Sequence, residues 1–592
     1  MNNHKMKRML MPGSLHGLVI LLLLSCQPKV NNDYLRRDGT QIVNNQGPFL
    51  IRAINFGNWM VQESYMMKTK GVFPQHKVKQ LINGLIGEEK SAVFYDTWRA
   101  NFVTEADVIH IKALGFNAIR LPMHYNLFTL PIESEAVKGE NTWLETGFIL
   151  TDSLLSWCTK HEVYLILDLH AAPGGQGKDA NINDYDAEKP SLWENPLNQE
   201  KTIALWAKLA SRYANEPWIG GYDLINETNW TFEEGKQENG LNDTSNLPLQ
   251  TLMMDITKAV RAVDQHHILF VEGNGWANNY HGLTPPWDSN MVYSFHHYWQ
   301  RNETRSIQRF LDMREKYQVP FWMGESGENS NEWFAEAIQL FELHGIGWAW
   351  WPYKKFDSRT CLMEVPVSPE YQKILDYQAN PVDSLKPDPE FAFRALMQLA
   401  ENHKLVNCKL NRGYHDAMFR QVVSNATLPF AENKVPGKIC AVDYDLGRMN
   451  QAYHDEGYAN FWVTDGGDGI DPNEGGFYRN DGVDITTADD PGGNGFCVFS
   501  IADGEWMKYT LNVTETALYQ VDTRVLNEGQ GGGKILFQTD GNTMLTLDVP
   551  PSDNKQWISL QADFRLEAGQ IPMTLRFVKG GFKLSTIAFT KK

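Results

Sequence analysis

The sequence predicts an α/β fold in which a (β/α)8 TIM barrel is followed by an all-β sandwich of the jelly-roll type. Three observations support this prediction. Eight short β-branched and aromatic runs lie within residues 49–353, amphipathic stretches separate most of them, and the composition changes beyond residue 436. Continuous apolar runs are typical of strands that are buried on both faces, as in a parallel barrel. An open, doubly wound sheet is the alternative that this pattern leaves.

The eight predicted strands alternate with helical stretches such as TEADVIHIKALG, in which Thr104 and Asp107 have the spacing of a capping box. The strands are expected at residues 49–55, 116–122, 163–170, 219–227, 267–273, 291–298, 320–326 and 345–353. Beyond them, PEFAFRALMQLAENHKL predicts a helix that packs on the barrel. The barrel domain with this extension is therefore placed at residues 34–430.

Residues 436–592 differ from the barrel because Gly and Asp dominate between alternating runs such as GEWMKYTLNV and ALYQVDTRVL. Short strands with turn residues at close intervals are typical of a β-sandwich. The sequence thus predicts a second domain over residues 436–592 and no tandem repeat.

The first 26 residues predict an export signal. Basic residues precede the apolar run LVILLLL, which is too short to span a bilayer and ends at Ser25–Cys26. The stretch LLSC resembles a bacterial lipobox, which implies cleavage before Cys26 and attachment of lipid to its thiol. We therefore expect a protein held in the cell envelope by lipid alone, in the outer membrane of a Gram-negative bacterium. Plain secretion is the alternative.

Charge and composition exclude several classes of partner. A formal charge of -18 argues against nucleic acid and against an anionic membrane surface as partners. The scattered cysteines lack CxxC spacing and therefore predict no metal site. Neighbouring His296 and His297 would point to opposite faces of a strand, so they would not share a zinc ion. The 19 Trp and 22 Tyr suit stacking on sugar rings, although most aromatic side chains fill cores.

Residues able to bind or react end nearly every predicted strand, and the strand ends of a barrel converge on one pocket. They are Asn55, Arg120, His170, Glu227, Glu272, His296, Glu325 and Trp351. Glu227 and Glu325 end the fourth and seventh strands, across the barrel mouth from each other. Such a pair suits glycoside hydrolysis, which needs an acid for the leaving oxygen and a second carboxylate. Glu272 is a rival carboxylate that we expect in the site wall, and each histidine could instead be a core residue.

The motifs FNAIRLP, LILDLHAAPGGQ, LINETN, YSFHHYW, WMGESG and GWAWWPYK resemble the strand ends of glycoside hydrolase family 5, the large retaining cellulase family. The resemblance runs in order from residue 35 to 355. It implies that Glu227 is the acid/base and Glu325 the nucleophile, and that no cofactor is needed. It also implies that Asn226 binds the sugar 2-hydroxyl and that Arg120 and Tyr298 keep Glu325 ionised. His170 and His296 would line the subsite of the attacked sugar, and Trp351 would be its stacking platform.

The sequence indicates the class of reaction more narrowly than the glycosidic linkage of the substrate. GNWMVQESYM resembles the fungal exo-β-1,3-glucanases of the same family, which implies that Glu63 grips the non-reducing glucose, whereas GKDANINDYDAEKPSLWENP departs from their pattern. The long loop from Gly57 to Phe116 could close one end of a cleft. Four tryptophans that follow strand ends are candidate subsite platforms: Trp193, Trp230, Trp276 and Trp299.

Stretches such as AVDYDLG, FYRNDGVDI and TRVLNEGQGGG resemble carbohydrate-binding module family 6, and the resemblance covers nearly all of residues 436–592. It implies glycan binding by Trp557 and Tyr478. The Glu that accompanies a structural calcium in this family falls at Val442, and the Asn that commonly contacts sugar falls at Lys583. Glycan binding, a structural calcium and a purely structural module therefore all stay open.

Together these features predict a lipid-anchored retaining β-glycosidase with a β-glycan partner, acting on β-glucan as an endo-glucanase. An exo-β-1,3-glucanase or another hemicellulase is the rival among enzymes. A non-catalytic surface glycan-binding protein is the rival from another class. The complete set of Arg120, Asn226, Glu227, Tyr298 and Glu325 argues against that binder, which needs neither an acid nor a nucleophile.

Overall fold

The computed structural model describes residues 34–236, 239–456, 473–527, 529, 531–540, 542–552 and 555–592. The predicted signal segment and its Cys26 lie outside the described residues. Within the described part of the chain, no helix combines the length and apolar composition needed to cross a bilayer.

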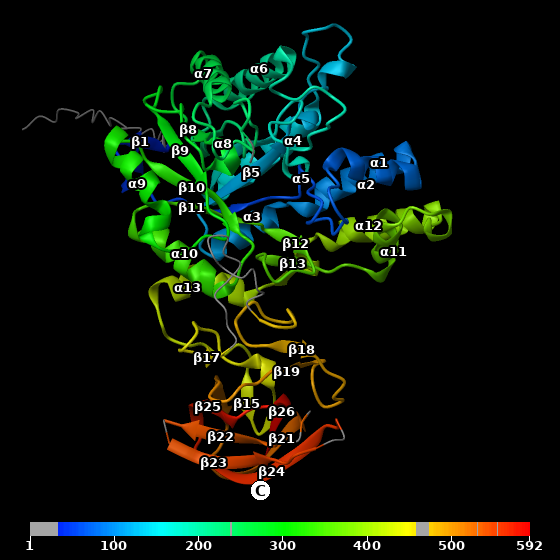
Figure 1. Cartoon of the computed structure of the whole chain (residues 1–592), viewed down its shortest axis with the longest axis vertical. Helices are drawn as coiled ribbons and strands as arrows, with labels where there is room; N and C mark the ends of the chain where they lie inside the picture. Colours follow the sequence, from blue (N-terminus) through cyan, green and yellow to red (C-terminus); the bar gives the residue numbers. More distant parts are fainter. Residues whose placement is uncertain are drawn as a thin grey trace, which may run out of the picture. The chain divides into compact units, whose positions relative to one another are not determined.

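Eight parallel strands close into a barrel, which confirms the predicted architecture over the open sheet (Figure 1). Their order around the barrel is β10-β11-β4-β5-β6-β7-β8-β9. The strands are β4 (Arg52–Asn55), β5 (Ala118–His124), β6 (Tyr164–Ala171), β7 (Ile219–Asp223), β8 (Leu269–Glu272), β9 (Met291–His296), β10 (Phe321–Gly327) and β11 (Trp348–Trp351). Nearly every residue of these strands is buried, as expected for strands with side chains packed on both faces.

One predicted strand boundary is wrong in a way that matters for the site. The fourth barrel strand ends at Asp223, so Glu227 lies in the loop that follows and not on the strand. Glu227 has a φ of 38°, which lies in the left-handed region and cannot continue an extended strand. Glu325, in contrast, lies within β10 beside a register shift that follows Met323. Such irregularities change the direction of a side chain next to an active site.

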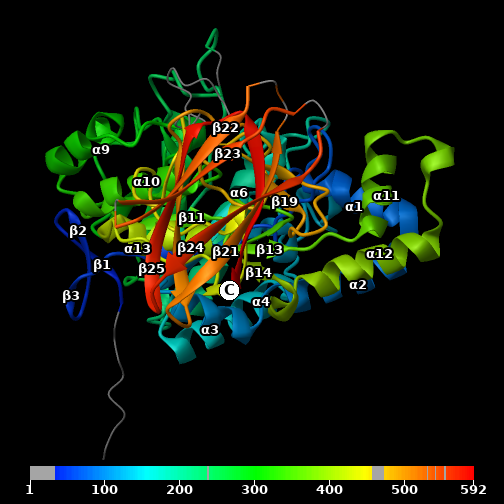
Figure 2. The same ribbon diagram turned by 90° about the horizontal axis from the view of Figure 1, so that it is seen from below.

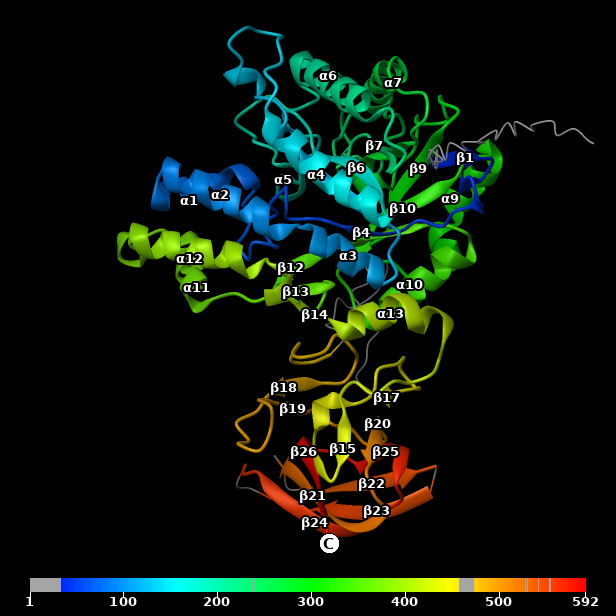
Figure 3. The ribbon, with the colours of Figure 1, turned by 180° about the vertical axis from the view of Figure 1, so that it is seen from behind.

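Helices cover the outside of the barrel (Figures 1 and 3). They are α3 (Glu105–Ala113), α4 (Glu145–His161), α6 (Pro196–Tyr213), α7 (Leu247–Arg261), α9 (Thr304–Tyr317) and α10 (Asn331–Leu343), with the short α5 (Ala180–Asn183) and α8 (Asn274–Ala277) in loops. Thr104 and Asp107 form the predicted capping box at the start of α3. The apolar faces of these helices join the main core around the barrel.

Two further groups of helices extend this domain. The segment between β4 and β5 contains α1 (Gln75–Ile86) and α2 (Glu88–Phe102), and the segment after β11 contains α11 (Pro369–Ala379), α12 (Pro389–Asn402) and α13 (Arg412–Val423). All three ribbon views show α1, α2, α11 and α12 gathered side by side (Figure 2). Small sheets complete the domain: β1 (Arg36–Asp38), β2 (Gln41–Asn44) and β3 (Gly47–Pro48), then β12 (Lys354–Phe356), β13 (Met363–Val365) and β14 (Lys409–Leu410).

The C-terminal domain is the predicted sandwich of two sheets. One contains β15 (Asn433–Val435), β17 (Tyr453–His454), β20 (Trp506–Val513), β22 (Gly533–Thr539), β23 (Asn542–Val549) and β25 (Gly569–Lys579). The other contains β16 (Gly437–Cys440), β18 (Ile485–Thr487), β19 (Phe496–Val498), β21 (Ala517–Asn527), β24 (Ile558–Leu566) and β26 (Phe582–Lys591). Alternate residues of β20 point inward, and they meet the other sheet in a second apolar core. The first strand begins at Asn433 and not at residue 436, because β15 pairs with β20.

Candidate active site

Arg120, on β5, is the centre of a buried network of charges at the carboxyl ends of the barrel strands. Its side chain is fully buried, and a buried guanidinium is costly unless carboxylates and hydrogen bonds surround it. It donates hydrogen bonds to Asp223 (2.9 Å), Glu272 (2.9 Å), Glu325 (3.0 Å), Asn226 (2.8 Å) and Asn55 (3.2 Å), and it lies 3.2 Å from a carboxylate oxygen of Asp168. One cation on β5 thus fixes side chains from β4, β6, β7, β8 and β10 and from the loop after β7.

Glu325 is held at both of its carboxylate oxygens. Arg120 donates to Oε2 at 3.0 Å, and the hydroxyl of Tyr298 donates to Oε1 at 2.9 Å. A carboxylate accepts hydrogen bonds at both oxygens, so two donors of this kind suit its ionised form. The side chain of Glu325 is only 7% exposed, which keeps this anion away from bulk water.

Glu227 lies in a different environment, between His296 and Glu272. Its Oε1 is 2.7 Å from Nδ1 of His296, while its backbone amide donates to Oε2 of Glu272 at 2.6 Å. Nε2 of His296 is in turn 3.2 Å from Oε1 of Glu272. Burial raises the pKa of Glu227, although His296 lowers it. Glu272 differs because, against the effect of burial, His296 and Arg120 lower its pKa.

The two candidate catalytic carboxylates are close together. One carboxylate oxygen of Glu227, one of Glu325 and a ring nitrogen of His296 all lie within 4.8 Å of one another. Retaining glycosidases separate their two carboxyl groups by about 5–5.5 Å, and inverting ones by about 6.5–9.5 Å. These three side chains are also of the types that ligate cations. Here, however, Arg120 and His296 already supply positive partners to the two carboxylates.

Asn226 and His170 are two further buried polar side chains of the site. Oδ1 of Asn226 accepts from Arg120, while its buried Nδ2 has no partner among the described residues. Nδ1 of His170 is 2.8 Å from Asp168, and its Nε2 is 3.5 Å from Oε1 of Glu63. Although burial opposes it, Asp168 raises the pKa of His170 to about 10. Burial raises the pKa of Glu63 to about 7, against the effect of His170.

Trp351 completes this part of the site. Its indole stacks parallel to the His170 ring, with ring centroids 5.5 Å apart, and its Nε1 donates to the hydroxyl of Tyr65. A Cβ on Gly57 would lie 2.3 Å from the indole, so only glycine allows the chain after β4 to pass this face. The structure therefore gathers the sequence-predicted residues in one place: Glu63, Arg120, His170, Asn226, Glu227, His296, Tyr298, Glu325 and Trp351. The four additional tryptophans lie nearer the surface, with Trp193, Trp230 and Trp276 half-buried and Trp299 exposed.

Sequence reasoning missed several members of the network. Asp168 and Asp223 are fully buried inside β6 and β7, where they balance Arg120. An ionisable residue within an apolar strand was the available signal, since a buried charge requires a partner. Tyr65, which contacts both Trp351 and Glu328, lies in a loop, as does Glu328, and neither carries a comparable signal.

The two predicted residues of the C-terminal domain lie in different surroundings. Trp557 is half-buried and donates from Nε1 to Asp489 at 2.9 Å. The hydroxyl of Tyr478 donates to Asp443 at 2.6 Å, and Lys409 of the barrel domain lies 5.9 Å from its ring. Tyr478 therefore packs against the barrel domain. Val442 is fully buried in the apolar core, so its side chain offers no oxygen to a cation.

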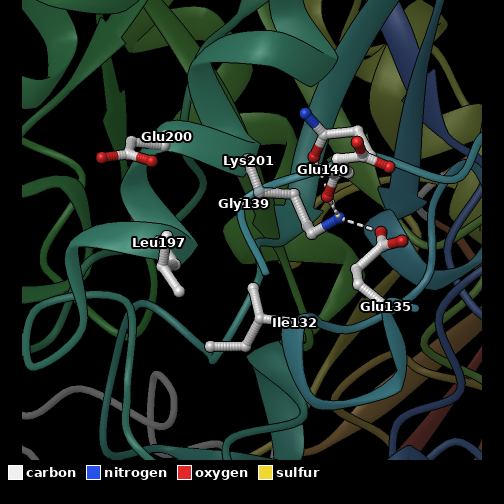
Figure 4. A pocket seen from close by; sticks show the side chains of 8 residues that line it. Ile132, Glu135, Gly139, Glu140, Leu197, Glu200 and Lys201 are labelled. Atoms are coloured by element: carbon white, nitrogen blue, oxygen red, sulfur yellow. Dashed lines mark hydrogen bonds and ion pairs between the residues drawn. The ribbon is translucent and has the colours of Figure 1, made fainter. Parts of the chain in front are cut away.

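A small pocket, open to solvent, lies apart from this network (Figure 4). Its lining residues are Ile132, Glu135, Gly139, Glu140, Asn141, Leu197, Glu200 and Lys201. Buried Lys201 bonds Glu135, and it also donates to Asn141 at 2.9 Å and to Thr129 at 3.1 Å. Its charge is thus satisfied internally, and no residue predicted for the active site lines this pocket.

Comparison with known proteins agrees with the geometry. Residues 81–357 match the family model described as cellulase (glycosyl hydrolase family 5), and residues 476–591 match that of carbohydrate binding module family 6. A β-xylosidase of Phanerodontia chrysosporium is 27% identical over 363 residues, which cover 54% of this chain and 71% of the relative. Endoglucanase C of Acetivibrio thermocellus is 26% identical over 337 residues, which cover 46% of this chain and 91% of the relative. A glucan 1,3-β-glucosidase of Candida oleophila is 26% identical over 193 residues, which cover 30% of this chain and 42% of the relative.

These matches coincide with the two structural domains and explain the paired carboxylates of the first. The barrel matches glycosyl hydrolase family 5 over residues 81–357, the sandwich matches carbohydrate-binding module family 6 over residues 476–591, and the chain is a glycoside hydrolase of the cellulase or glucanase type.

Proposed function

We propose that this enzyme hydrolyses β-glucosidic bonds of polysaccharide by double displacement with net retention, with Glu325 as nucleophile and Glu227 as acid/base. The observation that carries the proposal is the placement of one oxygen of each carboxylate within 4.8 Å of the other. Such closeness fits the short carboxyl separation of retaining enzymes better than the separation of about 6.5–9.5 Å in inverting ones.

In the first step, an oxygen of Glu325 attacks the anomeric carbon as the bond to the leaving oxygen breaks. Glu227 donates its proton to that oxygen, and a glycosyl ester of Glu325 results. In the second step, Glu227 takes a proton from water, the water oxygen attacks the anomeric carbon, and the ester bond breaks. The sugar leaves with its original anomeric configuration, and both glutamates return to their starting states.

The electrostatics of the site support this division of labour. Burial, and then the charge of Glu325 among other groups, raises the pKa of Glu227 and favours the protonated acid of the first step. When Glu325 becomes an ester its charge is lost, so the pKa of Glu227 falls and suits the base of the second step. Arg120 and Tyr298 bind both oxygens of Glu325. The unpartnered Nδ2 of Asn226 is a donor for the 2-hydroxyl of the attacked sugar.

The cellular location of the enzyme and the role of its C-terminal module are separate parts of the proposal. The LLSC stretch supports lipid attachment at Cys26 and a place in the outer membrane of a Gram-negative bacterium. Trp557 supports glycan binding by the C-terminal module, and no step of the reaction requires a metal or cofactor. The module's dependence on calcium is tested by its thermal unfolding with and without a chelator.

The test uses residues 27–592 and a panel of soluble and insoluble β-glucans, mannan and xylan, followed by reducing-sugar release. We expect activity on a β-glucan that Glu325→Ala abolishes and that Glu227→Ala reduces. Proton NMR of the first product should show the β anomer before mutarotation. An α anomer would contradict retention. Equal inertness of all three proteins on every polymer would favour a glycan-binding protein, which a pull-down with the same panel would detect.

A further inference from the structure

We infer that the enzyme cuts from the non-reducing end of its glycan, because a wall of interlocked loops closes the side of the site that receives the attacked sugar. This inference rests on the proposed roles of Glu227 and Glu325. It favours the exo alternative over the endo action expected from the sequence. We call this structure the glycone wall and define it as residues 63–69 with Asn181, Glu328, Lys355 and Asp357.

The orientation of the substrate follows from the position of the acid. Glu227 is bound to His296 of β9 and to Glu272 of β8, so the leaving oxygen must lie on that side of the barrel mouth. The attacked sugar then lies on the opposite side, toward Glu63, His170 and Trp351 of the strands or loops at β4, β6 and β11. In any glycosidic bond the attacked sugar belongs to the part of the chain that carries the non-reducing end.

The wall begins with a compact turn after β4. Within it, the amide of Met67 donates to the carbonyl of Glu63 at 3.0 Å, and that of Thr69 to the carbonyl of Ser64 at 2.9 Å. Glu63 and Ser64 are 5% and 3% exposed, although they lie in a loop at the barrel mouth. This burial means that other loops cover the turn.

On one side the turn is fixed to the loop after β6. Oγ of Ser64 donates to Oδ1 of Asn181 at 2.7 Å, and the same oxygen accepts from the amide of Phe73 at 3.0 Å. Behind this contact, Asp184 accepts from the amide of His76 at 2.7 Å and lies 3.0 Å from Nε2 of His124. The loops after β4 and β6 are therefore joined to each other and to the end of β5.

On the other side the turn is fixed to the loops after β10 and β11. The hydroxyl of Tyr65 donates to Glu328 at 3.3 Å, and Lys355 binds the same carboxylate at 2.7 Å. Lys68 pairs with Asp357 at 3.0 Å. Because Trp351 donates its indole N–H to Tyr65, the platform beneath the attacked sugar is itself bonded to the wall.

The wall also starts close to the reacting centre. Glu63, its first residue, is 3.5 Å from His170, whose ring stacks on Trp351 at 5.5 Å. A chain that continued beyond the attacked sugar would have to displace this buried pair and the turn behind it. The site therefore accepts a chain end with a short glycone, and it rejects an internal segment of a long chain.

The experiment compares two versions of one substrate, for aryl β-cellotrioside and aryl β-laminaritrioside in turn. One version has a free non-reducing end, and the other carries a 4,6-O-benzylidene group there. An end-directed site should cleave the free substrate at least about 100-fold faster than the blocked one, since steric exclusion in a closed pocket gives discrimination of this order. Equal rates would overturn the inference while leaving the proposed hydrolysis intact.

A variant tests whether the glycone wall causes this difference in rate between the free and the blocked substrate. Asn181→Ala removes the acceptor shared by Ser64 and Phe73, and it should raise the blocked-to-free rate ratio about 10-fold or more. Gln308→Ala, which removes an exposed amide on α9, is the matched control and should leave the ratio unchanged. A ratio that stays constant in Asn181→Ala would contradict the role of the wall. If wild type cleaves neither free substrate and no other aryl β-glycoside, the proposed function fails and the inference with it.

Discussion

The backbone amide of Glu227 donates a 2.6 Å hydrogen bond to the Oε2 atom of Glu272. This contact fixes a residue whose φ of 38° is unfavourable for any side chain other than glycine. Glu272 also binds Arg120 at 2.9 Å, so one carboxylate ties the proposed acid to the cation beneath the proposed nucleophile. Glu272 is thus a positioning residue for the catalytic pair.

Replacement of Glu272 by glutamine should lower kcat far more than it raises KM. The amide keeps the size of the side chain but loses the charge that binds Arg120 and His296, so Glu227 shifts within the site. A misplacement of about 1 Å can cost roughly 100-fold in rate, and a loss of that order in kcat is expected. Steady-state kinetics on an aryl β-glycoside checks this, and an unchanged kcat would show that Glu272 positions nothing.

In the pH profile of kcat/KM, the alkaline limb should report the loss of the proton from Glu227. His296 lies 2.7 Å away and lowers the pKa of Glu227, so His296→Asn should raise that pKa further. Glu227 would then stay protonated to higher pH, and the alkaline limb should move to higher pH even as the rate falls. His297→Asn is the control, because His297 faces Asn302 and Trp333. A limb that moves to lower pH in His296→Asn would contradict the assignment.

His170 should make the stability of the barrel depend on pH. Its folded pKa of about 10 lies above the ordinary value of 6.5, because Asp168 outweighs burial. The stability that it contributes is therefore fully present below about pH 6.5 and is lost as the pH rises through about 10. Calorimetry should show a smaller fall of Tm between pH 7 and pH 10 in His170→Gln than in wild type.

A control for this experiment is His403→Gln. Burial lowers the pKa of His403 to about 3, so its titration cannot contribute to any slope between pH 7 and pH 10. The fall of Tm between pH 7 and pH 10 should be the same in this variant as in wild type. If Tm falls equally between pH 7 and pH 10 in wild type and in His170→Gln, His170 is not held in its charged form.

Removal of the Asn226 side chain should weaken catalysis through the sugar 2-hydroxyl. Its Nδ2 has no partner among the described residues, and hydrogen bonds to that hydroxyl strengthen in the transition state. Asn226→Ala should lower kcat/KM about 100-fold on an aryl β-glucoside, and much less on the 2-deoxy analogue. Equal losses on both substrates would point to a general disturbance of Arg120 and not to a sugar contact.

The sequence was informative where one local pattern determines the outcome. The eight apolar runs predicted the closed barrel, and position on that strand count singled out Glu325 and the neighbourhood of Glu227. It did not show that β7 ends at Asp223, because the left-handed backbone of Glu227 depends on Glu272, which lies 45 residues later. The contacts of Ser64 with Asn181 and of Tyr65 with Glu328 are invisible for the same reason. They join loops that only the barrel topology brings together.

The most direct test of the catalytic assignment is to trap the covalent intermediate. An activated 2-deoxy-2-fluoro-β-glycoside, made with the sugar that the glycan panel identifies, slows the second step more than the first and lets the ester accumulate. Mass spectrometry should show one sugar per enzyme, on the peptide that contains Glu325. A label on another carboxylate, or an unlabelled enzyme that hydrolyses the parent glycoside to the α anomer, would contradict the double displacement proposed for Glu325 and Glu227.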